Sequence, residues 1–102
     1  MGAMETGGFE IPEGAAMFAT SHCPYCIRAE RLLKSKGVRV IKITVDQYPG
    51  QLARMRALSM DRRTVPQIFL AGEWIGGCDD LERMTSAEPE RLADLLARVA
   101  LR

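Results

Sequence analysis

The sequence has few of the features that mark specialised classes of protein. No apolar run approaches the roughly 20 residues that a membrane-spanning helix needs. The start of the chain has neither the basic nor the apolar segment of a secretory signal. The 14 Lys and Arg residues nearly balance the 13 Asp and Glu residues, so the formal net charge is only +1. We therefore expect no membrane partner, no nucleic-acid partner and a cytoplasmic location.

Cysteine and histidine are also scarce, with three cysteines and one histidine in 102 residues. An odd number of cysteines argues against a disulfide framework. In a reducing compartment a cysteine pair is more often catalytic or metal-binding than a permanent crosslink. The length suits one domain. We expect residues 1–13 to form a flexible tail, in part a cloning remnant, and residues 14–102 to form the domain.

The first half of the domain predicts a strand, a helix and a second strand. The apolar run at 15–19 predicts the first strand, and the run at 38–45, rich in β-branched residues, predicts the other. Between them, a helix is expected to begin at Pro24 and to end before Gly37. A strand, helix and strand in this order predict a parallel strand pair.

The second half begins with a helix predicted at 48–60 from Leu52, Met55 and Leu58, which recur at intervals of three. We interpret the methionines of this segment, Met55 and Met60, as core residues. Two short apolar runs follow and predict an antiparallel hairpin with its turn at 71–73; the runs are Ile68 to Leu70 and Trp74 to Ile75.

Two helices are predicted to end the chain. The first is capped by Asp79 or Asp80 and runs through Met84, with Glu82 placed for a capping-box contact to Asp79. The second is predicted by an apolar stripe at helical spacing, formed by Leu92, Leu95, Leu96 and Val99. The whole order, β-α-β-α-β-β-α-α, predicts an α/β fold with a four-stranded mixed sheet flanked by helices.

The cysteine pair in "CPYC" is the strongest chemical signal. Cys23 is expected at a helix N-terminus, where unpaired N–H groups and the helix dipole favour thiolate over thiol. Such a thiol has a pKa of roughly 3.5 to 7.5. Cys26, one turn further on and more shielded, can close a disulfide with it. This spacing predicts that Cys23 attacks a substrate disulfide and that Cys26 resolves the product.

The same spacing also occurs in zinc sites. A structural zinc site normally has four ligands, so a site here would need Cys78 and His22 beside the pair. We favour the reactive dithiol over this Cys-Cys-Cys-His site. We interpret His22 as a loop residue that affects the local charge, and Cys78 as a small buried hydrophobic residue.

Three separated segments resemble the motifs of dithiol glutaredoxins, in the same order and spacing: "CPYC" at 23–26, "TVPQIF" at 64–69 and "GGCDDL" at 76–81. The resemblance runs from about residue 15 to the C-terminus. It implies the thioredoxin fold and glutathione as cosubstrate, and we expect no tightly bound cofactor. We also expect a monomer, because the domain has no evident exposed apolar surface. The implied substrates are glutathionylated proteins, low-molecular-weight disulfides and disulfide-containing proteins.

The resemblance also implies a glutathione site. Tyr25 flanks the thiol, Pro66 follows a cis peptide, and the backbone of Val65 then faces an extended peptide such as glutathione. N–H groups at the start of the next helix, after the Gly76–Gly77 pair, would receive the γ-glutamyl carboxylate, and an aspartate its ammonium. The cations proposed for the glycine carboxylate are Arg28, Arg62 and Arg63. The full set of implied contacts is Tyr25, Arg28, Arg62, Arg63, Thr64, Val65, Pro66, Gly77, Cys78, Asp79 and Asp80.

Two positions depart from the family pattern. Thr20 replaces a lysine common three residues before the first cysteine, so either an arginine substitutes for it or glutathione binds more weakly. Asp61 stands near a place that often holds glycine. The alternative functions are a glutathione-assisted [2Fe-2S] cluster carrier, disfavoured by the Pro-Tyr pair between the cysteines, and a thioredoxin-type reductase, which normally carries Gly-Pro there.

Overall fold

The computed structural model describes residues 8–100. Within them, four strands and four helices follow one another in the predicted order. None of the helices in this part of the chain is long and apolar enough to cross a membrane. The elements are β1 Ala15–Ala19, α1 Pro24–Ser35, β2 Ile41–Thr44, α2 Pro49–Leu58, β3 Gln67–Leu70, β4 Glu73–Gly76, α3 Cys78–Ala87 and α4 Pro89–Ala100.

The strands form one mixed sheet in the order β2-β1-β3-β4. β1 pairs in parallel with β2, which places Ala16 opposite Ile41, and antiparallel with β3, which places Met17 opposite Ile68. β4 adds to the far side of β3 as an antiparallel strand. The helical crossover through α1 allows β1 and β2 to run in the same direction. The predicted four-stranded mixed sheet is therefore confirmed.

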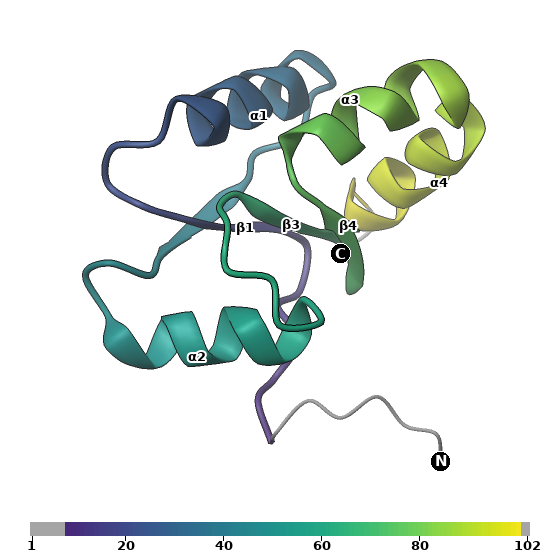
Figure 1. The fold of residues 1–102 in the computed structure, drawn as a ribbon. Coiled ribbons are helices and arrows are strands. Elements are labelled where there is room, and N and C mark those ends of the chain that lie inside the picture. Colours follow the sequence, from purple (N-terminus) through teal and green to yellow (C-terminus); the bar gives the residue numbers. More distant parts are fainter. Residues whose placement is uncertain (1–7, 101–102) are drawn as a thin grey trace.

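Helices cover both faces of this sheet, with α1, α3 and α4 on one side and α2 on the other (Figure 1). Met17 of β1 packs in the cluster beneath α1, α3 and α4, and the next residue, Phe18, packs in the cluster beneath α2. Successive side chains of a strand point to opposite faces, so a central strand covered on both sides must be apolar throughout. This explains why all five residues of β1 are buried.

The second predicted strand is shorter than expected, because its first residues still belong to the end of α1. The N–H of Gly37 donates to the carbonyl of Lys34 at 2.9 Å, and the N–H of Val38 donates to that of Leu33 at 3.1 Å. These bonds close the helix C-terminus in the usual way. Pairing with β1 therefore begins only near Ile41.

The α2 region departs most from the sequence prediction. Met55 and Leu58 are buried, but Leu52 is 40% exposed and Met60 is 81% exposed. The predicted core role is therefore confirmed for Met55 and wrong for Met60. Met60 lies beyond the last residue of α2 and has a φ of +50°, so it does not continue the helical periodicity.

The hairpin forms as predicted, although its turn is one residue shorter. Ala71 and Gly72 have φ values of +53° and +83°. A two-residue type I′ turn needs positive φ at both central positions. Glu73, predicted to lie in the turn, is the first residue of β4.

Part of the predicted N-terminal tail contacts the domain. Phe9 packs against the cluster that contains Phe18 and Met55. Arg54 of α2 donates from Nε to the carbonyl of Glu10 at 3.0 Å. The fold thus includes residues before Gly14, and residues 1–7 lie outside the described part of the chain.

Candidate active site

The dithiol lies at the start of α1, at the end of a short loop that follows β1. Cys23 is the N-cap residue in extended backbone, and Pro24 occupies the first helical position, where its missing N–H costs no hydrogen bond. Cys23 and Cys26 form a disulfide with their Cα atoms 5.2 Å apart. The N–H of Cys26 donates to Sγ of Cys23 at 3.1 Å. A sulfur thus takes the acceptor role that an N-cap hydroxyl or carboxylate usually fills.

The helix pattern explains the different surroundings of the two cysteines. Cys26, Ala29 and Leu33 form the buried face of α1. Cys23 is 8% exposed and Cys26 is 3% exposed, so Cys23 is the more accessible of the pair. The first turn of α1 contains no acidic residue, and its positive end therefore faces the sulfur without local compensation.

The second part of the site is the loop before β3. The peptide bond between Val65 and Pro66 is cis, as expected. Gln67 follows and is fully buried. Its Nε2 donates to the carbonyl of Thr64 at 3.0 Å, which ties the loop to the sheet. Val65 packs against the core cluster that includes both Cys23 and Cys78, so the loop lies beside the dithiol.

The third part is the start of α3, where the predicted cap is wrong. Gly77 is the N-cap residue, and its N–H donates to Oδ2 of Asp80 at 2.8 Å. The helix begins at Cys78, so Asp80 occupies the third helical position and makes the contact predicted for Glu82. Gly76 has a φ of +111°, and a Cβ there would collide with the Asp80 carboxylate. Glycine therefore permits this close approach.

Glu82 has a different partner. It pairs with Arg28 of α1 through two contacts, Nε to Oε2 at 2.5 Å and Nη2 to Oε1 at 3.0 Å. Such a two-point contact fixes the guanidinium in orientation as well as position. It joins α1 and α3 and engages the arginine that was predicted to bind glutathione.

A groove of about 280 Å³ is lined by Tyr25 of α1, by the proline loop and by the start of α3. Most of the predicted contact residues line it, whereas Cys23 and Cys26 do not. Arg28 and Arg63 are not among the lining residues, and Arg62 is the cation of the groove. The lining residues are Tyr25, Arg62, Thr64, Val65, Pro66, Gly77, Cys78, Asp79 and Asp80.

The two aspartates of the groove differ in their bonding. Burial acts to raise the pKa of Asp80, but the N–H of Gly77 and the guanidinium groups of Arg83 and Arg62 outweigh it, and the pKa lies below the usual value. Asp79 is exposed. Asp80 is thus already held by several donors, and Asp79 is the carboxylate better placed to receive a new cation.

Cys78 has the opposite environment from the one expected for Cys23. Burial first, and then the negative charge of Glu82, raise the pKa of the Cys78 thiol above its usual value. Cys78 is free and buried. Its interpretation as a small buried residue fits this surrounding, although it also lines the groove.

A larger hollow of about 550 Å³ lies at the other end of α1, between Glu30, Lys34 and Arg39. The residues that line it include no cysteine, and they come from the end of α1 and the segment before β2. The groove next to the dithiol is therefore the candidate site on chemical grounds. Within residues 8–100 no group of three or more His, Cys, Asp or Glu side chains is arranged to hold a metal ion, so the zinc alternative gains no support.

The sequence reasoning missed two residues behind the groove, Gln67 and Trp74. Nε1 of Trp74 donates to Oε1 of Gln67 at 2.8 Å. The guanidinium of Arg62 lies over the Trp74 ring, 5.3 Å from its centroid. A polar residue inside the apolar run "PQIFL" was the available signal for Gln67, because a buried amide must be hydrogen-bonded. Trp74 gave no signal beyond its place in a strand.

A mixed sheet between helices, with a Cys-x-x-Cys pair at the start of α1 and a cis-proline loop beside it, defines a thiol-disulfide oxidoreductase of the thioredoxin fold. A family model described as "Glutaredoxin" matches residues 15–75. The chain belongs to the glutaredoxin family.

The chain is similar to several known members of this family. It is 42% identical over 71 residues to a glutaredoxin from Pseudomonas aeruginosa, covering 70% of this chain and 83% of that protein. It is 45% identical over 65 residues to glutaredoxin 3 from Escherichia coli K12, covering 64% of this chain and 77% of that protein.

Solved structures show the same likeness. The crystal structure of a buckwheat glutaredoxin-glutathione complex matches with a TM-score of 0.73 at 27% identity, over 95% of this chain and 84% of that one. The holo form of glutaredoxin C1 from Populus tremula x tremuloides matches with a TM-score of 0.71 at 26% identity, over 94% and 90% of the two chains.

Proposed function

We propose that this protein is a glutathione-dependent oxidoreductase that reduces protein-glutathione mixed disulfides, low-molecular-weight disulfides and protein disulfides, in a reducing compartment such as the cytosol. The observation that carries the proposal is the groove beside the dithiol, which is lined by the proline loop, a cation and a helix N-terminus. The glutathione complex of the buckwheat relative supports glutathione as the occupant.

Each end of glutathione has a matching group in the groove. The N–H groups of Cys78 and Asp79 at the N-terminus of α3 suit the γ-glutamyl carboxylate, and Asp79 suits its ammonium. The backbone of Val65 suits the peptide groups in the middle of the molecule. Arg62 suits the glycine carboxylate and supplies the positive charge that Thr20 does not.

The cycle starts from the reduced protein. The thiolate of Cys23, stabilised by the α1 N-terminus, attacks the glutathione sulfur of a mixed disulfide. The new bond joins Cys23 to glutathione, and the substrate protein leaves as a thiolate that takes up a proton. The thiolate of a second glutathione then attacks the bound glutathione sulfur, which releases oxidised glutathione and restores the Cys23 thiolate.

Cys26 has a separate role when the substrate is a protein disulfide. After Cys23 forms a mixed disulfide with the substrate, Cys26 attacks Cys23 and expels the second substrate thiol. The product is the Cys23–Cys26 disulfide found in this structure. Two molecules of glutathione then reduce it. No contact among residues 8–100 favours the cluster carrier.

The test is turnover of a glutathionylated peptide by reduced glutathione. Wild type and Cys26→Ser are expected to be active, and Cys23→Ser is expected to be inactive. A folded wild-type protein that does not use glutathione would overturn the proposal. Activity in Cys23→Ser would overturn the assignment of the nucleophile.

A further inference from the structure

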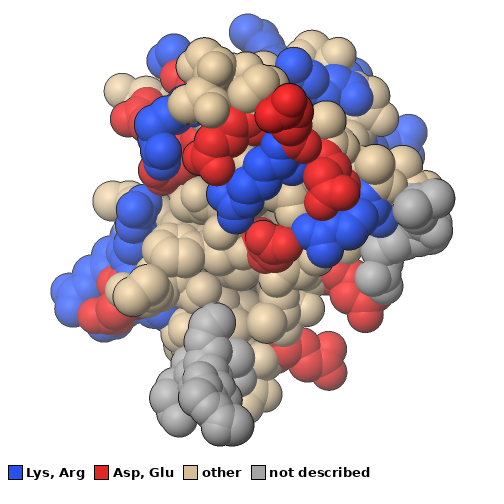
Figure 2. Space-filling model, turned by 90° about the vertical axis from the view of Figure 1, so that its right-hand side faces the viewer, with Lys and Arg blue, Asp and Glu red and all other residues tan. Residues whose placement is uncertain are grey.

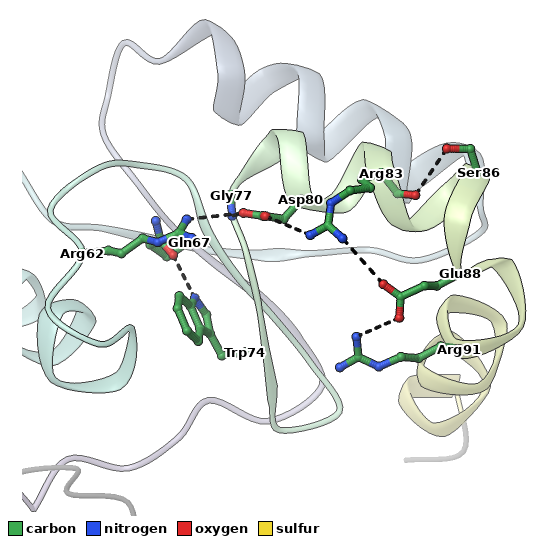
Figure 3. Close-up of polar contacts among 9 residues, drawn as sticks. All are labelled: Arg62, Gln67, Trp74, Gly77, Asp80, Arg83, Ser86, Glu88 and Arg91. Carbon is green, nitrogen blue, oxygen red and sulfur yellow. Dashed lines mark hydrogen bonds and ion pairs between the residues drawn. The ribbon is translucent and has the colours of Figure 1, made fainter.

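Trp74 is not among the residues that line the groove, but it contacts one of them, Arg62, and it contacts the side chain of Gln67, which bonds to a second lining residue, Thr64. Figure 3 shows Trp74 beside Gln67 and Arg62. It is the single tryptophan of the sequence and lies on β4, the strand that leads into the Gly76–Gly77 pair. Its ring holds Arg62, and its N–H holds Gln67. These contacts connect β4 to the two ends of the proline loop.

The first contact holds the cation of the groove. Arg62 Cζ lies 5.3 Å from the centroid of the indole ring, and its Nη1 lies 3.3 Å from Oδ2 of Asp80. A guanidinium over an indole face is attracted by the ring electrons. Arg62 is therefore held from two directions, by the ring of Trp74 and by the carboxylate of Asp80. An incoming carboxylate can displace Asp80 while the ring still supports the guanidinium.

The second contact acts through a buried amide. Gln67 is fully buried, and its side chain has one acceptor end and one donor end. Oε1 accepts from Trp74 at 2.8 Å, and Nε2 donates to the carbonyl of Thr64 at 3.0 Å. Loss of the indole N–H would leave Oε1 buried without a donor, which is costly and releases the orientation of the amide. The backbone of Thr64 would then lose a fixed partner.

Asp80 links this arrangement to the outer surface. Asp80 and Arg83 begin a series of ion pairs that continues through Glu88 and Arg91 (Figure 3). Positive and negative side chains alternate over this face, with no large region of one sign (Figure 2). Such exposed pairs contribute little individually. Trp74, in contrast, contacts the buried side chain of Gln67.

We propose that Trp74 is a positioning residue of the glutathione groove: its ring holds Arg62, and through Gln67 it holds Thr64, so that both are ready for a carboxylate-bearing thiol. This rests on the proposed function. The proposal separates Trp74 from ordinary core residues, because it requires both the indole ring and the indole N–H. A core role alone would be satisfied by any aromatic ring.

The test compares Trp74→Phe and Trp74→Leu with a control at Tyr48. Tyr48 is an aromatic residue that is 60% exposed and precedes α2. Trp74→Leu removes both contacts and is expected to raise KM for glutathione about ten-fold, with kcat changed less than about two-fold. Trp74→Phe keeps a ring and loses the N–H, so an intermediate rise is expected. Tyr48→Leu is expected to change neither constant.

A second comparison tests the route through Arg62. In an Arg62→Met background, Trp74→Leu is expected to raise KM by a smaller factor than in wild type, because one of its two contacts is already lost. If Trp74→Leu raised KM by the same factor in both backgrounds, Trp74 would not act through Arg62, and that part of the proposal would be wrong. If Trp74→Leu does not fold, the same comparison is made with Trp74→Phe.

The outcomes separate the two proposals. A wild-type protein that does not turn over with glutathione contradicts the proposed function and this inference together. If the wild type turns over normally and Trp74→Phe has the same KM for glutathione, the positioning role is wrong. The proposed function then still stands. A fall in kcat and in thermal stability with an unchanged KM would show a purely structural role and would also overturn it.

Discussion

α1 and α3 both begin at the groove, and each has a cysteine at its start. Cys23 is the N-cap of α1, and Cys78 is the first residue of α3. In the first, the sulfur accepts a backbone N–H and faces a helix turn without acidic residues. In the second, the thiol is buried near Glu82, and its pKa is raised, by burial first.

We infer from this difference that a helix N-terminus alone is not enough to make a thiol reactive. The start of α3 is already compensated, because Asp80 accepts from the N–H of Gly77 and Asp79 adds a second negative charge. At the start of α1 no acidic residue lies in the first turn, and the Cys23 sulfur is the group that accepts the backbone N–H. Reactivity thus depends on which group caps the helix and which charges lie within the first turn.

The largest expected effect separates the two thiols by function. Cys23→Ser is expected to reduce turnover of a glutathionylated peptide by roughly 10³-fold or more, because the hydroxyl cannot replace the thiolate as nucleophile. Cys78→Ser is expected to keep most of the activity. Steady-state rates at equal enzyme concentration provide the measurement. A Cys78→Ser enzyme as inactive as Cys23→Ser would refute the contrast between the two helix starts.

The second prediction measures the thiols directly. In reduced protein near pH 7, Cys23 is expected to react with iodoacetamide roughly 100-fold faster than Cys78, since thiolate fraction and access both favour it. The comparison uses Cys26→Ser/Cys78→Ser, which retains Cys23, and Cys23→Ser/Cys26→Ser, which retains Cys78. Adding denaturant should bring the two rates close together. Similar rates in the folded variants would contradict the prediction.

The third prediction concerns the cap of α3. Asp80→Asn is expected to lower the free energy of unfolding by about 1 kcal/mol, because it removes the charged acceptor from the first turn. Asp80 has its pKa lowered from 3.8 in the folded protein by the N–H of Gly77 and by Arg83 and Arg62, which together outweigh the opposing effect of burial. Its contribution is therefore present above pH 3.8 and lost as the pH falls through the lower folded value.

Urea unfolding of wild type and Asp80→Asn at several pH values tests this. The stability difference should be constant near neutral pH and should shrink in the acid range. Asp79→Asn is the matched control, because Asp79 is the exposed neighbour and should change stability by less than about 0.5 kcal/mol. If both variants lost the same free energy of unfolding, Asp80 would not be the specific cap of α3, and the prediction would be wrong.

The element order and the dithiol could be predicted from the sequence because their signals are local. Pro24 and Gly37 mark the ends of one helix, and the β-branched residues that follow it favour a strand. The cap of α3 was harder to predict, since "GGCDD" offers several starts within three residues. The choice depends on the backbone at Gly76, whose φ is +111° in the folded chain, and this value cannot be predicted from the sequence because glycine adopts both signs of φ.

The remaining unpredicted features come from contacts distant in sequence. The pairing of Arg28 with Glu82, 54 residues away, is one of them, and a glutathione contact of Arg28 stays a prediction. Trp74 acts through Arg62 and Gln67, which come together only when β3 and β4 pair. Met60 was assigned to the core from residue type, but the chain has left the helix there. The hydrophobic periodicity of the sequence carries no information about which distant side chains contact each other.

The smallest expected effect tests the charge near Cys78. Glu82 raises the pKa of Cys78, although less than burial does. Glu82→Gln removes that charge and frees Arg28, so the Cys78 thiolate fraction and its alkylation rate should rise by about two- to five-fold. The measurement uses the Cys23→Ser/Cys26→Ser background, in which Cys78 is the single cysteine. Glu88→Gln is the control, since Glu88 pairs with Arg83 and Arg91 instead. An unchanged rate in Glu82→Gln would mean that burial alone keeps Cys78 protonated, and the contrast between the two helix starts would then be one of access rather than charge.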